Sequence, residues 1–281
     1  MKLLTEADRR FLDENGYLVA PGIVPVEDCE AVIDALFDFL EMKRDDPSDW
    51  YRHPLKPGGM VEIYQHQALW NNRQNPRMHA LFSDIYGTDA LYVTIDRVGF
   101  KPPYNPEHPE FDHRGFTHWD IDTNNIPARF GVQAVLCLTD TTAEMGGFQC
   151  VPGFHIGLEE WVSRQPADRN PRVPDLASLP PDKRVTPIPA SAGSMIIWNN
   201  RLLHGNGRNI GQRPRFSQYI SMYPADRMTP ESREHRIRCW QNREPPGGTV
   251  FPGDPREIEQ NRYKTADLTD LGRKLLGIDP W

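Results

Sequence analysis

The stretch Gly193-Ser-Met-Ile-Ile-Trp198, which continues into Asn200-Arg-Leu-Leu-His-Gly-Asn-Gly207, is the most informative part of the chain. β-Branched and aromatic residues bounded by turn-forming residues predict a short buried strand. His204 stands just after this strand, and the glycines downstream of it let the backbone turn sharply while the imidazole projects inward. The stretch therefore predicts a β-structure that presents a histidine at a strand end.

Four further segments have the same composition and are also bounded by turn signals, namely residues 91–100, 131–138, 147–151 and 215–222. Several short strands with no helices between them are typical of a sandwich or jelly roll. We therefore predict a mainly β core at about residues 89–224.

Helix signals stand on both sides of this core. Thr5 with Asp8 three residues later is a capping-box-like start, and Gly16 supplies a stop. Asn75 before a proline, with Gly87 just past the end, is the clearest punctuation of a helix. Together with apolar residues at helical spacing, these signals predict helices at residues 5–16, 26–40, 75–87 and 265–276.

No linker divides the chain, so we predict one domain over residues 1–281. It has a helical N-terminal part at about 1–88, the β core at about 89–224 and a C-terminal extension at 225–281. A proline-rich excursion at 161–190 carries no strand signal. Loops of that length in a compact domain are usually functional covers or disordered, so this excursion and the segment 105–112 are both candidate lids.

Composition limits the possible function. The chain of 281 residues is 38% hydrophobic, and 39 acidic against 32 basic residues give a net charge of −7, which disfavours a nucleic-acid or anionic-membrane partner. No apolar run approaches the roughly 18 residues that span a bilayer, and the first residues lack a signal-peptide pattern. Four dispersed cysteines fit reduced thiols. We expect a cytoplasmic monomer or homodimer that binds a small molecule.

One constellation of residues carries chemistry. In Thr117-His-Trp-Asp120, His118 and Asp120 are two positions apart, so a strand points both side chains to one face. With His204 they make up a two-histidine, one-carboxylate set. Arg215 follows His204 by eleven residues and opens the next strand, where a guanidinium can pair with a carboxylate held beside a metal. Each residue alone is ordinary, but the combination is much less common by chance.

In these segments the chain resembles the phytanoyl-CoA dioxygenase family of Fe(II)- and 2-oxoglutarate-dependent oxygenases, over roughly residues 8–224. The resemblance implies a double-stranded β-helix core of the jelly-roll or cupin-like type. The matching segments are Phe11-Leu-Asp-Glu-Asn-Gly-Tyr-Leu-Val19, Thr117-His-Trp-Asp120, residues 138–155, and residues 192–207 followed by Arg215.

Carried over by position, the resemblance implies that His118, Asp120 and His204 bind Fe(II). It implies that Arg215, with Arg213 as the next candidate, holds the distal carboxylate of 2-oxoglutarate. Asn206 stands where the family often has a small hydroxyl residue and is expected to contact the cosubstrate. The implied reaction uses O₂ and hydroxylates a small organic metabolite with release of succinate and CO₂. Related halogenases have a small residue in place of Asp120, which argues against halogenation.

Other functions remain open at this point. The same triad serves desaturation, cyclisation and epimerisation. A non-catalytic β-helix protein that binds a metal or a small molecule is a second alternative, although it would not need Arg215. A zinc hydrolase is a third, and it is disfavoured because neither a HExxH motif nor an evident general base accompanies the ligands.

Overall fold

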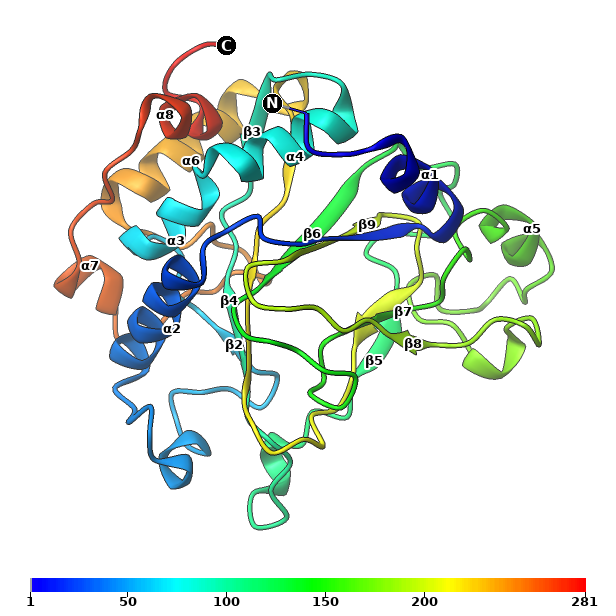
Figure 1. Cartoon of the computed structure of the whole chain (residues 1–281), viewed down its shortest axis with the longest axis horizontal. Helices are drawn as coiled ribbons and strands as arrows, with labels where there is room; N and C mark the ends of the chain where they lie inside the picture. The colour runs from blue at the N-terminus through cyan, green and yellow to red at the C-terminus, as the bar shows by residue number, and fades with distance from the viewer. Residues whose placement is uncertain (1) are drawn as a thin grey trace.

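The computed structural model describes residues 2–281 (Figure 1). Two antiparallel sheets form the core, as expected for a jelly roll, and a two-stranded sheet lies beside them. The six-stranded sheet has the order β1 (Tyr17–Ala20), β9 (Met195–Asn199), β6 (Val132–Cys137), β11 (Arg215–Tyr219), β4 (Val98–Lys101) and β2 (Met60–Val61). The four-stranded sheet has the order β5 (Phe116–His118), β10 (His204–Asn206), β7 (Phe148–Cys150) and β8 (Thr186–Pro187), and the small sheet pairs β12 (Met222–Pro224) with β3 (Leu91–Val93).

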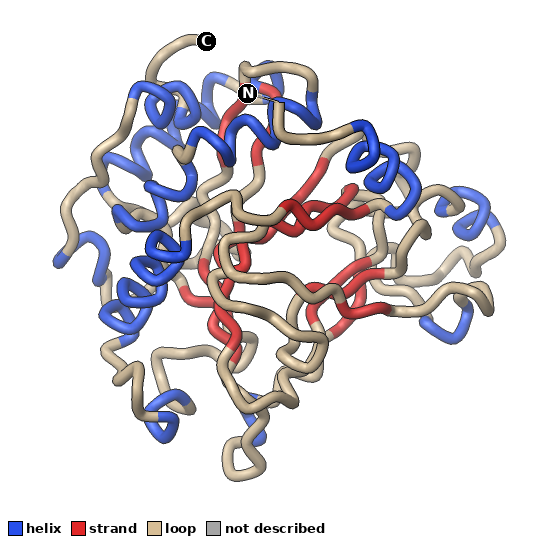
Figure 2. Tube along the Cα trace, viewed as in Figure 1, coloured by secondary structure: helices blue, strands red, loops and turns tan. Residues whose placement is uncertain are grey.

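Helices cover the side of the larger sheet that faces away from the smaller one (Figure 2). They are α2 (Val26–Leu40), α3 (Gln67–Arg73), α4 (Pro76–Tyr86), α6 (Pro230–Asn242), α7 (Ile258–Arg262) and α8 (Asp270–Leu276), while α1 (Glu6–Asn15) and α5 (Leu158–Ser163) lie elsewhere on the surface. The predicted caps are confirmed: Thr5 and Asp8 form a capping box, and Gly87 ends α4 in the left-handed conformation.

The larger sheet separates an apolar core from a polar cavity. Side chains alternate between the two faces of a strand, so Phe216 of β11 packs into the helix-covered core with Phe37 and Phe100. Its neighbours Arg215 and Ser217 face the opposite way, toward the smaller sheet. This alternation places charged side chains in the cavity between the two sheets and keeps them out of the apolar core.

Two predicted strands are each interrupted. Residues 91–100 form β3 and β4, and residues 215–222 form β11 and the first residue of β12. The two breaks lie at the same level because Thr94 and Ser221 form hydrogen bonds with each other. On the far side of this point the two segments belong to the small sheet, in which β3 pairs with β12. The backbone carbonyl of Asp96, between β3 and β4, accepts a hydrogen bond from the side chain of Arg73 (2.7 Å).

The C-terminal extension packs back onto the N-terminal part. The buried Glu259 carboxylate accepts hydrogen bonds from the backbone N–H groups of Tyr64 (2.8 Å) and Gln65 (2.7 Å). The predicted helix at 265–276 was too long, because it begins only after Thr269, whose side chain caps α8. No helix within residues 2–281 has the length and apolar character needed to cross a membrane.

Candidate metal and cosubstrate site

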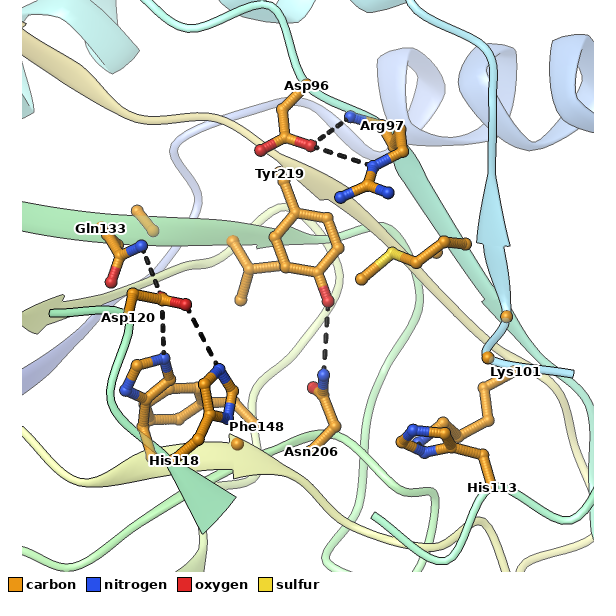
Figure 3. A pocket seen from close by; sticks show the side chains of 18 of the residues that line it. Asp96, Arg97, Lys101, His113, His118, Asp120, Gln133, Phe148, Asn206 and Tyr219 are labelled. Carbon is orange, nitrogen blue, oxygen red and sulfur yellow. Dashed lines mark hydrogen bonds and ion pairs between the residues drawn. The ribbon is translucent and has the colours of Figure 1, made fainter. Parts of the chain in front are cut away.

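The three predicted metal ligands converge at one end of the smaller sheet. Strands β5 and β10 pair so that His118 lies directly opposite His204. Nε2 of His118 lies 3.3 Å from Oδ1 of Asp120, and Nε2 of His204 lies 3.4 Å from Oδ2. The ligand atoms all lie within 4.8 Å of one another, and Figure 3 shows the Asp120 carboxylate directed at the imidazole of His118.

This donor set fits Fe(II). Two imidazoles and one carboxylate on one face are the facial triad of non-heme iron sites. Ligands about 2.0–2.2 Å from an ion and at right angles lie about 3 Å apart, close to the separations seen here. Nδ1 of His204 lies 2.9 Å from the carbonyl of Leu202, which leaves Nε2 directed at the cavity. Burial raises the pKa of Asp120, but the adjacent His118 and His204 side chains outweigh it and hold that pKa well below its usual range.

Gly205 is required for a reason that differs from the one predicted. The glycines after His204 were expected to allow a sharp turn, yet Gly205 lies inside the extended strand β10. A Cβ at this position would lie 1.9 Å from the carbonyl oxygen of Phe116 on β5. Only glycine therefore lets β5 and β10 approach closely enough to bring His118 and His204 together.

Arg215 lies buried in the same cavity as the triad. Its Nη1 donates to Oγ of Ser217 (2.5 Å), and its Nη2 donates to the carbonyl of Gly146 (3.1 Å) and lies 3.4 Å from Oδ1 of Asn206. All of these acceptors are neutral, and Nε is buried without a partner among residues 2–281. A buried guanidinium with no carboxylate partner is costly unless an anionic ligand binds it.

Lys101 is a second buried cation, and the sequence analysis missed it. It pairs with Arg215 across β4 and β11, and its Nζ donates to the carbonyl of Gly207 at 2.7 Å. Nζ also lies 3.0 Å from Nδ1 of His113. Burial, and then repulsion by Arg215, lowers the pKa of Lys101 to about 7. An anion between the two cations would relieve that repulsion. The alternation with core-facing Val98 and Phe100 was the signal that could have located it.

Asn206 lies between the histidines and Arg215. Its Nδ2 is 3.3 Å from the hydroxyl of Tyr219, and its Oδ1 faces Arg215. Asn206 lines the cavity, so a cosubstrate bound there can reach it. Its contact with the cosubstrate stays a prediction. Arg213, the alternative anchor, lies outside this cavity, in a separate depression against α2.

The cavity has a volume of about 550 Å³ and lies between the two sheets. Apolar walls are formed by Val135, Phe148 and Trp198. Among the described residues, neither candidate lid, 161–190 or 105–112, supplies a residue that lines the cavity. The excursion at 161–190 contains β8, which pairs with β7, and Arg172, which donates to the carbonyl of Asp120. Residues 58–60 and 250–251 line the cavity.

Sequence comparison relates the chain to dioxygenases. The profile of the family described as Phytanoyl-CoA dioxygenase (PhyH) matches residues 12–217. A Dictyostelium discoideum protein provisionally named phytanoyl-CoA dioxygenase is 27% identical over 282 aligned residues, covering 80% of this chain and 77% of that protein. The ectoine dioxygenase of Halomonas elongata is 23% identical over 234 aligned residues, covering 77% of this chain and 69% of that enzyme.

Structural comparison supports the fold. A hypothetical protein of Escherichia coli superposes with a TM-score of 0.67 at 18% identity, covering 98% of this chain and 82% of that protein. At this identity the likeness concerns the fold alone. It confirms the predicted double-stranded β-helix core with flanking helices. The match to the family profile ends at residue 217, before the C-terminal extension, which contributes Val250 and Phe251 to the lining of the cavity.

Proposed function

Because the chain belongs to the phytanoyl-CoA dioxygenase family of Fe(II)- and 2-oxoglutarate-dependent oxygenases, we propose that it hydroxylates a small organic metabolite while 2-oxoglutarate is converted to succinate and CO₂. One observation carries the proposal. A single cavity holds the triad His118, Asp120 and His204 together with two buried cations, Lys101 and Arg215, that have no carboxylate partner.

The triad, the two cations and Asn206 each have a part in this reaction. His118, Asp120 and His204 would hold Fe(II) as its protein ligands. The bound metal and 2-oxoglutarate supply the oxidative chemistry with O₂. Arg215 binds the distal carboxylate of 2-oxoglutarate in a charge-assisted hydrogen bond, and Lys101 adds a second positive charge. Asn206 lies between the metal ligands and this anchor, where its amide can donate to the cosubstrate.

The apolar side chains that line the cavity exclude water from the site of the reaction. Phe148 packs against Trp198 with ring centroids 4.6 Å apart, and both line the cavity beside His204. Excluding water from this region strengthens the ion pairs that hold the cosubstrate and protects reactive species from side reactions.

The triad and the anion-binding end together support catalysis over simple binding. A protein that only binds a metal would have no use for two buried cations at a fixed place beyond it. Desaturation, cyclisation and epimerisation use the same ligands, so the product decides among them. Hydroxylation adds one oxygen atom, desaturation removes two hydrogens, and epimerisation leaves the mass unchanged.

The experiment uses the purified protein with Fe(II), 2-oxoglutarate and a metabolite extract under ¹⁸O₂, followed by mass spectrometry. We expect one metabolite to gain a single ¹⁸O atom, with ¹⁸O also entering succinate. The Asp120→Ala variant is the control and should give neither signal. A consumed metabolite whose product carries no ¹⁸O and has lost two hydrogens would replace hydroxylation by desaturation or cyclisation, which give the same change in mass.

A reducing compartment, as in the cytoplasm, belongs to the same proposal. The four cysteines are free and buried, and burial raises the pKa of the Cys150 thiol to about 12. Such thiols are unreactive and need no disulfide partner, which supports a reducing environment. The oligomeric state, monomer or homodimer, stays a prediction.

A further inference from the structure

The cavity has a second polar end that the reaction described above leaves unused. Asp96 and Arg97 lie between β3 and β4, and both line the cavity. Val250 and Phe251 of the C-terminal extension line it beside them. Figure 3 shows the pair across the ring of Tyr219 from the metal ligands, and well away from Lys101.

Arg97 and Lys101 are held by different parts of the cavity wall, the Arg97 guanidinium by Val250 and Phe251 and the Lys101 amine by the carbonyl of Gly207. The two residues are four positions apart along one extended run, so at about 3.3 Å per residue their Cα atoms are separated by about 13 Å. Lys101 pairs with Arg215, whereas the carbonyl of Arg97 accepts a hydrogen bond from the backbone N–H of Tyr219, which lies four residues beyond Arg215 on β11. A cosubstrate anchored by Arg215 therefore leaves Arg97 available to another molecule.

The guanidinium of Arg97 is held firmly and still keeps a free donor. Its Cζ lies 4.7 Å from the centre of the Phe251 ring, and its Nη1 donates to the carbonyl of Val250 at 2.8 Å. Its Nε lies 3.5 Å from Oδ1 of Asp96, and Nη1 lies 3.7 Å from Glu62. Among residues 2–281, Nη2 has no hydrogen-bond partner, so one NH₂ group is available to a ligand in the cavity.

Asp96 places a free acceptor next to this donor. Oδ1 accepts the backbone N–H of Arg97 at 2.7 Å, and Oδ2 has no partner in the described chain. The backbone on either side is fixed, because buried Arg73 donates to the carbonyl of Asp96. Burial raises the pKa of the Asp96 carboxyl, and its interactions with Arg97 offset that rise only in part.

We propose that Asp96 and Arg97 bind the prime substrate and that this substrate is a compact zwitterion, with a carboxylate for Arg97 and an ammonium N–H for Asp96. The inference rests on the proposed function and names the substrate class for the same site. Asp96 and Arg97 already pair with each other through Oδ1 and Nε, so a purely anionic ligand would leave Oδ2 of Asp96 without a donor, and a purely cationic one would leave Nη2 of Arg97 without an acceptor, each at a cost. The cavity of about 550 Å³ also holds 2-oxoglutarate, which limits the substrate to a small molecule.

The test uses three charge forms of one scaffold. Protein loaded anaerobically with Fe(II) and 2-oxoglutarate is titrated calorimetrically with L-proline, N-acetyl-L-proline and L-prolinamide, and then with the same forms of L-leucine and L-glutamine. In at least one series we expect the zwitterion to bind roughly 10- to 150-fold more tightly than either single-charge form. If no zwitterion binds more tightly than its derivatives, including the case in which none binds, the proposal is overturned.

Two charge-removing variants assign the two contacts. Asp96→Asn should weaken binding of the zwitterion but leave the N-acetyl form unchanged, and Arg97→Gln should weaken the zwitterion but leave the amide form unchanged. Arg262→Gln, which removes a surface ion pair with Glu41, serves as the control. Equal affinities for the zwitterion in all three variants would contradict the assignment. Failure of the underlying oxygenase function is seen separately, as a loss of Fe(II)-dependent 2-oxoglutarate binding without any probe.

Discussion

The side-chain amide of Gln133 donates to Oδ2 of Asp120 at 2.7 Å, which links the two sheets at the metal site. Gln133 belongs to β6 of the larger sheet, whereas Asp120 follows β5 of the smaller one. The amide is itself fixed, because Nε1 of Trp198 on β9 donates to its oxygen at 3.2 Å and the two residues pair across the strands. Hydrogen bonds of this kind orient a ligating carboxylate before the metal arrives.

Replacing Gln133 by leucine should therefore weaken metal binding. Loss of a hydrogen-bonding partner to a metal ligand typically costs about 10- to 100-fold in affinity. Co(II) titration of the metal-free protein measures this directly and needs no substrate. Gln149→Leu is the matched control, because Gln149 alternates with cavity-facing Phe148 on β7 and points away from the site. Equal Co(II) affinities in the two variants would show that Asp120 needs no support from the larger sheet.

Gly205→Ala should disturb the metal site by forcing the backbones of β5 and β10 apart. The new methyl group would lie 1.9 Å from the carbonyl oxygen of Phe116, so β5 and β10 must separate. Overpacking typically costs about 1–3 kcal/mol, and separating the strands also moves His118 from His204. The melting temperature and the affinity for Co(II) should both decrease. Gly157→Ala is the control, since a Cβ there meets nothing within 4 Å. Wild-type metal affinity in Gly205→Ala would contradict the close-approach argument.

Arg215→Ala should raise the Kd for 2-oxoglutarate. A charge-assisted hydrogen bond contributes about 1.5–3 kcal/mol, which corresponds to about 10- to 150-fold in affinity. Calorimetry in the presence of Fe(II) without O₂ gives the value. Arg213→Ala, in the segment that precedes β11, is the control, because Arg213 lies outside the cavity. If instead Arg213→Ala weakens binding and Arg215→Ala does not, the anchor has been assigned to the wrong residue.

Lys101 should make 2-oxoglutarate binding depend on pH. Its pKa in the ligand-free protein is about 7, and a bound carboxylate favours the protonated amine. Raising the pH from about 6 to about 9 removes that proton, so the Kd for 2-oxoglutarate should rise through this range. His113, whose pKa is lowered to about 4 by burial and by Lys101, is neutral throughout, and Arg215 stays charged. Lys101→Met should bind more weakly at pH 6 and show a flatter profile; an unchanged slope would assign the dependence to another group.

The parts of the site that the sequence predicted are those set by local spacing. His118 and Asp120 are two residues apart, although β5 ends at His118 and Asp120 lies just beyond it; His204 follows the predicted strand at 193–198 and Arg215 opens the next one, so local patterns locate them. Lys101 and Gln133 were missed because their roles depend on which strands pair and in what register. That register brings Lys101 opposite Arg215, and it is set by the tertiary packing of the two sheets.

The same reasoning explains the errors in the fold. The break between β3 and β4 arises from contacts with Ser221 and Arg73, both distant in the sequence. Helix α6 has few apolar residues in Pro230–Asn242, so the helical period gave little signal there. The C-terminal extension was uninformative on its own, yet Glu259 ties it to the N-terminal part and Phe251 reaches the cavity.

The most direct test of the central claim is succinate formation from 2-oxoglutarate by the purified protein, without substrate, with and without added Fe(II) and O₂. The account predicts slow turnover that requires both and that is lost in His118→Ala, Asp120→Ala and His204→Ala alike, since the three ligands act as a unit. Succinate formation that persists at the wild-type rate in any of these variants, or that proceeds without Fe(II), would contradict it.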